Sequence, residues 1–277
     1  MAEPGTLERS DLPLAVIVGA GALGLAVCRC LGQSHRLLIA DRDEARLASV
    51  SAMLDAEGYD ASTAVCDITS DDDVARLAAR AKGPVRSLVH VAALSVSAGD
   101  FRKVLTVNIG GAARVAEAFV DVLAPYGCAV FVSSSSAHMG VPEAAVLDLL
   151  EGPLASGFAE RLEAALPPEA VSAGSAYSLS KLAMNLMCRR LAPAWGRKRL
   201  RIVSLSPGLI ATPMGAQAYR DAPAKRRLFD AVPLEREGTM PEIAGVVEFL
   251  LSDRASYITG TDILADGGLL ASLGNKT

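Results

Sequence analysis

Leu14-Ala15-Val16-Ile17-Val18-Gly19-Ala20-Gly21-Ala22-Leu23-Gly24 is the stretch that decides the fold. Its first five residues are apolar and of strand length, which is typical of a central parallel strand buried on both faces. A Gly-x-Gly-x-x-Gly motif follows, and a helical pattern then runs through Leu31. The glycines allow a tight turn and let backbone amides approach a pyrophosphate at the positive end of that helix. An ordinary glycine turn is the alternative interpretation.

A second strand, predicted at residues 36–40, ends in Asp41. A carboxylate at this strand end can accept hydrogen bonds from both hydroxyls of an adenosine ribose, and it repels a 2′-phosphate. The sequence therefore favours NAD over NADP as the cofactor. Arg42 leaves NADP open, because an arginine beside the ribose can accommodate the 2′-phosphate.

Strands and helices continue to alternate along the chain. We predict a helix at residues 44–56, a strand at 62–66, a helix at 71–81 and a strand at 87–91. Asp67 follows the third strand, where its carboxylate either reaches the adenine or takes a helix-capping role. Successive βα units of this length predict an α/β Rossmann fold, with a doubly wound parallel sheet of about seven strands and helices on both faces. Without a linker that could divide it, the chain of 277 residues is predicted to be a single domain, with residues 1–11 as a flexible amino-terminal segment.

The second half carries polar side chains at the ends of predicted elements. Asn108 interrupts a helix predicted at residues 100–123, and a strand predicted at residues 129–132 opens into the serines at 133–136. Tyr177 and Lys181 follow in a helical pattern one turn apart, so their side chains share a face. A phenol has a pKa of roughly 10, and a neighbouring ammonium lowers that pKa. The pair indicates proton transfer to or from a hydroxyl or carbonyl; two solvated neighbours are the alternative.

Composition and charge argue against several other classes. The formal net charge of −4 gives no electrostatic case for binding nucleic acid or an anionic membrane. The apolar run at residues 12–28 lacks a basic leading region, and Arg29 closes it before it could span a bilayer. The five cysteines and three histidines have no metal-ligand grouping, so we predict no metal. Free thiols are typical of a reducing compartment, and we predict a cytoplasmic protein.

Taken in order, these features resemble the short-chain dehydrogenases/reductases over roughly residues 12–270. The matching motifs are the glycine turn, Asp41, Asp67, Asn108, Ser133-Ser134, Tyr177-x-x-x-Lys181, Ser206-Pro207-Gly208, Thr212, Tyr257-Ile258-Thr259-Gly260 and Asp266-Gly267-Gly268. The resemblance implies a nicotinamide dinucleotide as cofactor, a small alcohol or ketone as substrate, and a homo-oligomer, either a dimer or a tetramer.

The resemblance also implies roles for individual residues. Tyr177 would be the general acid/base, and Lys181 would lower its pKa and bond the nicotinamide ribose. Ser134, or Ser135 one residue later, would hydrogen-bond the substrate oxygen, and Asn108 would hold a water behind Lys181. The residues expected at the cofactor are Gly19, Gly21, Leu23, Gly24, Asp41, Arg42, Asp67, Ile68, Ala92, Tyr177, Lys181, Pro207, Gly208, Ile210 and Thr212.

Three features depart from the family pattern. The glycine turn is one residue shorter between its last glycines, and Val91-Ala92-Ala93 stands where Asn-Ala-Gly is expected. The third departure is an insertion at residues 140–174, which resembles that of bacterial 3α-hydroxysteroid dehydrogenase/carbonyl reductase-type members. It is either a lid over a bulky apolar substrate or a subunit-contact or packing element. Residues 215–232 are expected to form a mobile substrate loop with a helical part, and residues 240–251 a last helix.

Three hypotheses for the function remain. The first is an NAD(P)-dependent oxidoreductase that interconverts a secondary alcohol and a ketone, with a steroid- or terpenoid-like substrate in view. The second is an NAD-dependent epimerase of a sugar nucleotide, against which the short chain argues. The third is a non-catalytic dinucleotide-binding protein, which the altered glycine turn motivates although Tyr177 and Lys181 are both present.

Overall fold

The computed structural model describes residues 11–211 and 223–274, and a seven-stranded parallel sheet lies at its centre. The sheet has the order β3-β2-β1-β4-β5-β6-β7, so the predicted doubly wound Rossmann fold is confirmed. The strands are β1 (Leu14–Val18), β2 (Arg36–Asp41), β3 (Ala61–Val65), β4 (Val85–His90), β5 (Leu123–Val132), β6 (Arg201–Pro207) and β7 (Asp262–Ala265). The order reverses between β1 and β4, and the carboxyl ends of strands at such a point are where this fold binds ligands. The predicted flexible segment 1–11 falls, apart from residue 11, outside the described residues.

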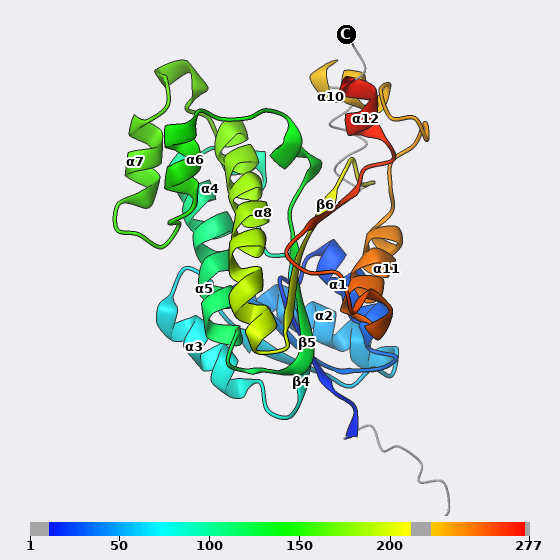
Figure 1. Ribbon diagram of the computed structural model, residues 1–277. Coiled ribbons are helices and arrows are strands. Elements are labelled where there is room, and N and C mark those ends of the chain that lie inside the picture. The colour runs from blue at the N-terminus through cyan, green and yellow to red at the C-terminus, as the bar shows by residue number, and fades with distance from the viewer. Residues whose placement is uncertain (1–10, 212–222, 275–277) are drawn as a thin grey trace, which may run out of the picture.

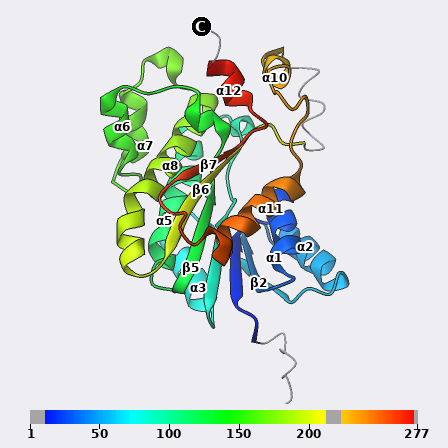
Figure 2. The same cartoon turned by 45° about the vertical axis from the view of Figure 1, so that its right-hand side comes forward.

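Helices cover both faces of the sheet (Figures 1 and 2). One face packs against α1 (Ala22–Leu31), α2 (Glu44–Ala56) and α11 (Met240–Leu251). The other packs against α3 (Asp71–Arg80), α4 (Phe101–Leu105), α5 (Gly111–Phe119) and α8 (Ala173–Arg197). Every residue of β1 is buried, as expected for a strand between two helical layers.

The helix predicted at residues 100–123 is wrong in its extent. α4 passes into a π-helical turn, Thr106–Gly110, which contains Asn108, and α5 ends at Phe119. β5 already begins at Leu123. Leu123 pairs with Val85 of β4 instead of continuing the helix, and Pro125, which cannot donate a helical hydrogen bond, would not fit a helix through this segment.

The insertion folds onto the α4 and α8 side of the molecule (Figure 1). It forms α6 (Ala144–Leu150), α7 (Phe158–Ala164) and a short 3-10 turn, Pro168–Ala170. α7 contacts α4, and α6 contacts α8. Phe158 and Leu162 are buried in the same apolar cluster as residues of α4 and α8. The insertion is therefore packed within its own subunit, while a further role as lid or subunit contact stays a prediction.

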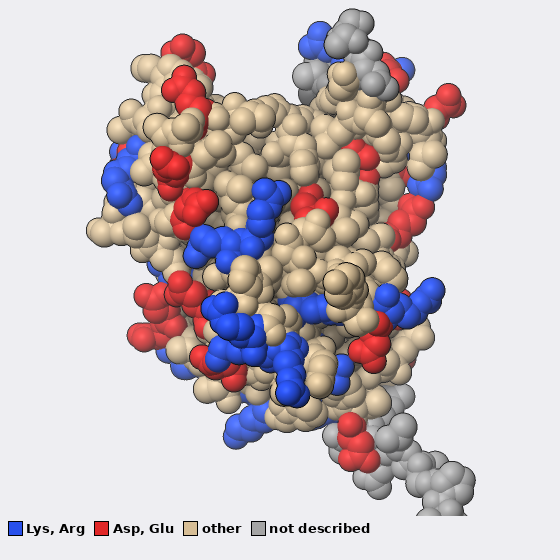
Figure 3. Space-filling view, viewed as in Figure 1, with Lys and Arg blue, Asp and Glu red and all other residues tan. Residues whose placement is uncertain are grey.

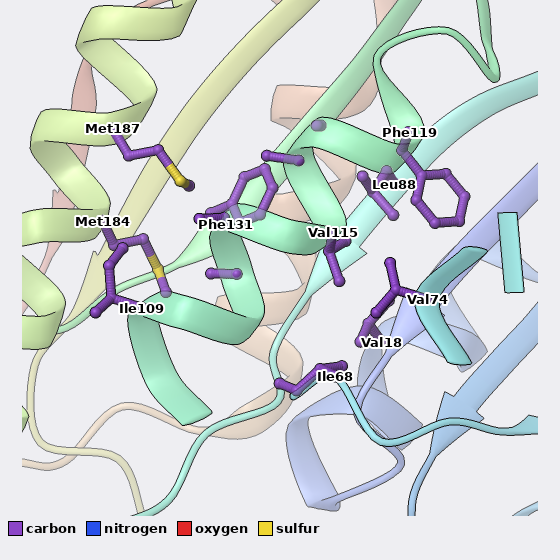
Figure 4. Packing of buried hydrophobic residues seen from close by; sticks show 14 of the residues in the cluster. Val18, Ile68, Val74, Leu88, Ile109, Val115, Phe119, Phe131, Met184 and Met187 are labelled. Carbon is purple, nitrogen blue, oxygen red and sulfur yellow. The ribbon is translucent and has the colours of Figure 1, made fainter. Parts of the chain in front are cut away.

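The core between β5 and α8 holds the long helix α8 in place. Met184 and Met187 reach from α8 toward the strand, and Phe131 of β5 lies between that helix and Val115 of α5 (Figure 4). At its start, α8 has a capping box in which Ser172 and Ser175 satisfy each other's backbone amides. Burial and capping together fix the first turns of the helix, where Tyr177 and Lys181 lie.

Two helices lie beyond the carboxyl ends of the strands (Figure 1). They are α10 (Pro223–Phe229), the helical part of the predicted substrate loop, and α12 (Leu269–Gly274). The remainder of that loop up to residue 222 lies outside the described residues. Positive and negative side chains are interspersed on the face shown in Figure 3. In the described part of the chain, none of the helices is both long and apolar enough to cross a membrane.

Candidate active site

The glycine turn between β1 and α1 is built by close backbone approaches. Gly19 has a φ of +113°, and a Cβ there would lie 2.7 Å from the backbone nitrogen of Ala92. A Cβ on Gly24 would overlap the carbonyl oxygen of Gly19, whereas one on Gly21, at the start of α1, meets nothing within 4 Å. Gly19 and Gly24 are thus required by packing, and Gly21 leaves the positive end of α1 open on one side. These residues fit a dinucleotide pyrophosphate despite the shortened turn.

Asp41 ties the end of β2 to this turn. Its Oδ2 accepts a hydrogen bond of 2.8 Å from the backbone N–H of Ala20, and its Oδ1 accepts one of 3.0 Å from Asp43. Arg46 approaches the carboxylate, at 3.5 Å, and Arg42, which was expected to leave NADP open, is exposed. The carboxylate is therefore preorganised beside the turn, with an arginine already within reach of it.

The other residues expected near the adenosine differ in what they do. Asp67 closes a local turn, because its Oδ1 accepts hydrogen bonds from both the N–H and the hydroxyl of Thr69. Ile68 is buried against Gly111, and Leu23 is partly buried on the opposite face of the sheet. Ala92 donates its N–H to the carbonyl of Val18.

The Val91-Ala92-Ala93 departure is compensated by the backbone. The N–H groups of Val91 and Ala92 both donate to the carbonyl of Val18, at 2.9 Å each, and this ties β4 to β1 without an asparagine side chain. The side chain of Val91 also packs against Gly19. This departure therefore does not separate the two strands at the cofactor turn.

On the catalytic side, β5 opens into Ser134, which lies beside Tyr177. The Ser134 hydroxyl accepts a hydrogen bond of 3.2 Å from the N–H of Ser136, so its own hydrogen can be donated elsewhere. Burial raises the pKa of the Tyr177 phenol, and the neighbouring Ser134 hydroxyl acts in the opposite direction. This net direction is opposite to the lowering expected from Lys181. Ser134 is favoured over Ser135 as the serine that bonds the substrate oxygen, because Ser135 is buried.

Lys181 is the buried cation of the site. It is 2% exposed, its Nζ donates a 2.8 Å hydrogen bond to the carbonyl of Val132, and the same atom lies 5.6 Å from the centroid of the Tyr177 ring. Burial lowers its pKa from 10.5 to about 8. Ser133 holds the helix itself, because its hydroxyl donates to the Lys181 carbonyl at 2.9 Å.

Asn108 is fully buried, and its side chain is committed to structure. Its Oδ1 accepts a 2.7 Å hydrogen bond from the N–H of Leu94, and its Nδ2 donates to the Leu94 carbonyl at 3.1 Å and to Ser180 at 3.3 Å. The side chain thus fixes the segment after β4 against α8. Its role in holding a water behind Lys181 stays a prediction.

The residues after β6 lie where the nicotinamide is expected. The N–H of Gly208 donates to the Ala265 carbonyl at 3.0 Å, and a Cβ on Gly208 would lie 2.6 Å from the Cα of Asp266. Pro207 is the last residue of β6, and Ile210 forms a bridge with Gly238. Thr212 lies outside the described residues.

A groove of about 340 Å³ lies near Ser134 and Tyr177 and borders the insertion. Its lining includes Ser136 after β5, Ser178 and Leu182 of α8, and Val141 and Leu166 of the insertion. Neither Ser134 nor Tyr177 lines this groove, but Ser136, two residues after Ser134, and Ser178, directly after Tyr177, do. The insertion therefore shapes a surface next to the site.

Among known protein families, two family models match this chain, one in each half. A family model described as short chain dehydrogenase matches residues 13–146, and one described as Enoyl-(Acyl carrier protein) reductase matches residues 167–270. The short-chain dehydrogenase/reductase bsc3 of Alternaria brassicicola is 32% identical over 271 residues, which is 95% of this chain and 97% of the relative. The chain belongs to the short-chain dehydrogenase/reductase family. It is accordingly an oxidoreductase, and the predicted enzyme class is confirmed.

Other relatives of this dehydrogenase/reductase carry different specificities. Galactitol 2-dehydrogenase (L-tagatose-forming) of Cereibacter sphaeroides is 29% identical, over 95% of this chain and 97% of the relative. The 3-alpha-hydroxysteroid dehydrogenase from Pseudomonas sp. B-0831, solved with NADH, is 26% identical, with a TM-score of 0.75 over 95% of this chain and 99% of that one. An actinorhodin polyketide ketoreductase solved with NADPH, 22% identical with a TM-score of 0.74 over 95% and 99% of the two chains, shares the fold.

Two features of the site were missed in the sequence. Ser180, between Tyr177 and Lys181, holds Asn108, and the helical pattern of residues 177–191 gives no sign of this bond. His90 is a buried residue, and its position at the end of β4 brings it under the influence of the Lys181 charge. Like Asp41 at the end of β2, His90 is the last residue of its strand. This position could have indicated that His90 lies near the site.

Proposed function

We propose that this dehydrogenase/reductase interconverts a secondary alcohol and a ketone, with Tyr177 as general acid/base and NAD(H) as the preferred cofactor. The observation that carries the proposal is the arrangement of Ser134 beside the Tyr177 phenol with the buried ammonium of Lys181 one helical turn away. A bound nicotinamide would supply or accept the hydride.

The residues of this chain would manage the proton and the substrate oxygen. Ser134, whose hydroxyl already accepts from Ser136, would donate a hydrogen bond to the carbonyl oxygen. In the direction of reduction, the Tyr177 phenol would give its proton to that oxygen; in oxidation, the phenolate would take it back. The charge of Lys181 would stabilise that phenolate, and its Val132 hydrogen bond would hold the ammonium in place.

The preference for NAD rests on Asp41. Its carboxylate is fixed by the amides of Ala20 and Asp43 beside the open end of α1, where it would repel a 2′-phosphate. Arg46 is the group that would favour NADP if it turned away from the carboxylate.

An apolar substrate is the class that we propose for the site. The groove between α8 and the insertion is lined mainly by apolar side chains, and the insertion would act as a lid over the distal part of the substrate. The similarity to a 3-alpha-hydroxysteroid dehydrogenase supports this class. The similarity to galactitol 2-dehydrogenase makes a polar polyol the outcome to test against it.

Location and assembly complete the proposal. Cys28, Cys66, Cys128 and Cys188 are buried free thiols and Cys30 is a partly buried one, which is consistent with a reducing, cytoplasmic setting. A homo-oligomer, dimer or tetramer, is proposed from family membership.

The test combines binding with turnover. NADH and NADPH are titrated against the purified protein by cofactor fluorescence, and oxidation is then screened with 3α-hydroxysteroids, cyclic terpenoid alcohols and galactitol. We expect tighter binding of NADH, turnover of an apolar alcohol, and a loss of about 10³-fold in kcat for Tyr177→Phe with cofactor binding kept. Most of the turnover surviving in Tyr177→Phe would overturn the catalytic assignment, and binding without turnover on any alcohol or ketone would favour a non-catalytic protein.

A further inference from the structure

His90 is a fully buried imidazole whose polar atoms are unsatisfied. It ends β4, in register with Val18 of β1 and Phe131 of β5, and its ring lies 5.5 Å from that of Phe131. Its solvent exposure is 0%, and neither Nδ1 nor Nε2 makes a hydrogen bond of normal geometry among the described residues, although the nearby backbone of Ala92 acts to raise the pKa of the ring. Leaving a buried polar group unpaired costs roughly 1–3 kcal/mol, whereas an apolar ring of the same shape would carry no such cost. A histidine in this position needs a further explanation.

The neighbour with a complementary need is Lys181. An ammonium has three N–H donors, and within residues 11–211 and 223–274 its one hydrogen-bond acceptor is the Val132 carbonyl. Val132 directly follows Phe131, the residue whose ring lies against His90, so the lysine head group and the imidazole occupy the same end of the β4 and β5 pair. A buried donor with spare hydrogens and a buried acceptor with a free lone pair thus share one region.

We propose that His90 is a positioning residue for Lys181, with one imidazole nitrogen accepting a hydrogen bond from a buried water that in turn accepts one from the ammonium. The proposal rests on the function proposed above, because the ammonium matters there as the group that stabilises the Tyr177 phenolate. His90 would act through the lysine and would not touch the substrate.

The charges around the imidazole are consistent with an acceptor. Burial and the positive charge of Lys181 lower the pKa of His90 to about 3, so the ring is neutral over the working range. β1 and β5 contribute the apolar Val18 and Phe131 in register with it, and α8 contributes Lys181 as the charged group that acts on it. A neutral ring keeps one lone pair available to an ammonium at any pH above about 4.

A pair of variants separates hydrogen bonding from packing. His90→Phe keeps an aromatic ring against Phe131 and removes the acceptor, whereas His90→Gln retains an acceptor on a side chain of similar reach. His35→Gln is the matched control, because His35 lies in the turn before β2 and bonds Ser87 on β4. The titration of Lys181 is followed in each protein without cofactor, by the ¹³Cε chemical shift of labelled lysine.

We expect His90→Phe to lower the titration midpoint of Lys181 by about one pH unit, since a hydrogen bond to a charged group contributes roughly this much. The alkaline limb of kcat/KM would move down by the same amount, because the ammonium is lost earlier. His90→Gln should stay within a few tenths of a unit of the wild type, and His35→Gln should match it. An unchanged midpoint in folded His90→Phe, or an equal shift in His90→Gln, would overturn the proposal and leave His90 as a packing residue.

A measurement on the unmutated protein keeps the inference testable if His90→Phe does not fold. The imidazole ¹⁵N shifts of His90 should change as Lys181 loses its proton near pH 8, while those of His35 should not follow that midpoint. A His90 signal that is constant from pH 7 to pH 9 would contradict the hydrogen bond. Because this readout needs neither cofactor nor substrate, its failure is distinguishable from a failure of the proposed activity.

Discussion

The glycine turn and the first turns of α8 serve the same site, but they are held in place in different ways. In the glycine turn, backbone approaches backbone: Gly19 lies against Ala92, Gly24 against Gly19, and Asp41 bonds the amide of Ala20. At α8, buried polar side chains do the positioning: Lys181 on the helix itself, and Asn108 of the Thr106–Gly110 turn, which bonds Ser180 of the helix. The first arrangement requires small residues, and the second carries the cost of removing charge and dipoles from water.

Because of this difference, we expect substitutions in the two regions to affect stability and activity in different proportions. Residues of the turn should be needed for folding and for cofactor binding together, because the same contacts serve both. Residues of the α8 site should be needed for chemistry and should cost stability, as is common where a group is buried for its reactivity. Substitutions in the glycine turn and in the α8 site can test this contrast.

The largest effect is expected for Lys181→Met. Activity should fall by about 10²–10⁴-fold, because the phenolate of Tyr177 loses its stabilising charge. Thermal stability at pH 7 should rise, because a methionine of similar volume carries no buried charge and this gain exceeds the loss of the Val132 hydrogen bond. The measurements are kcat/KM and the midpoint of denaturant unfolding, with Lys198→Met as control, since Lys198 is an exposed partner of Asp121.

The pH dependence of the same pair has a definite sign. The pKa of Lys181 is about 8 in the folded chain and 10.5 as its ordinary value, so the unfolded chain binds more protons between these limits. Wild-type stability should therefore rise with pH from about 8 to 10.5 relative to Lys181→Met, by up to about 3 kcal/mol. A stability difference between the two proteins that stays constant over this window would mean that the ammonium is not desolvated as the structure indicates.

The second effect is a contrast between two glycines of the turn. Gly24→Ala should destabilise the protein by about 1–3 kcal/mol and abolish cofactor binding, because its methyl group overlaps the Gly19 carbonyl. Gly21→Ala should leave the unfolding midpoint nearly unchanged, since nothing lies within 4 Å of its Cβ, and should weaken NADH binding at least about tenfold by facing the pyrophosphate. Unimpaired NADH binding by Gly21→Ala would place the dinucleotide elsewhere.

A smaller effect is expected for Asp41→Asn. The amide oxygen can still accept a hydrogen bond from Ala20, so the turn should keep its shape, while the repulsion of a 2′-phosphate is removed. The ratio of the NADPH and NADH dissociation constants should shift toward NADPH by about tenfold, helped by Arg46. Asp55→Asn, which alters an exposed carboxylate in the last turn of α2, is the control and should leave the ratio unchanged.

The same contrast explains what could be predicted from the sequence. Glycine spacing encodes a backbone shape directly, so the turn, β1 and the acid after β2 could be inferred from residues alone. Tyr177 and Lys181 could be paired because four residues make one helical turn. The bonds that Asn108 makes with Leu94 and Ser180, and the approach of Arg46 to Asp41, depend on how separate segments pack, and no local pattern records them.

The helix end before β5 was predicted wrongly for a related reason. Apolar spacing at the helical period continues past Phe119 to Leu123, but Pro125 and the pairing of Leu123 with Val85 take that residue into the sheet. The apolar residues do recur at the helical period, but this period carries no information about the strand pairing that competes with the helix.

The smallest effect tests the insertion, which belongs to neither side of the comparison. Arg102 of α4 forms ion pairs with Glu160 and Glu163 of α7, and all three side chains are substantially exposed to solvent. Exposed pairs contribute little, so Arg102→Ala should lower the free energy of unfolding by less than about 1 kcal/mol. Hydrogen exchange of the α7 amides should change little, because the buried Phe158 and Leu162 hold the helix.

Lys198→Ala, which breaks an ion pair far along α8 from the insertion, is the control. A large and selective rise in the exchange of the α7 amides in Arg102→Ala would instead show that the ion pairs hold α7 in place. That result would favour a movable lid over a fixed packing element.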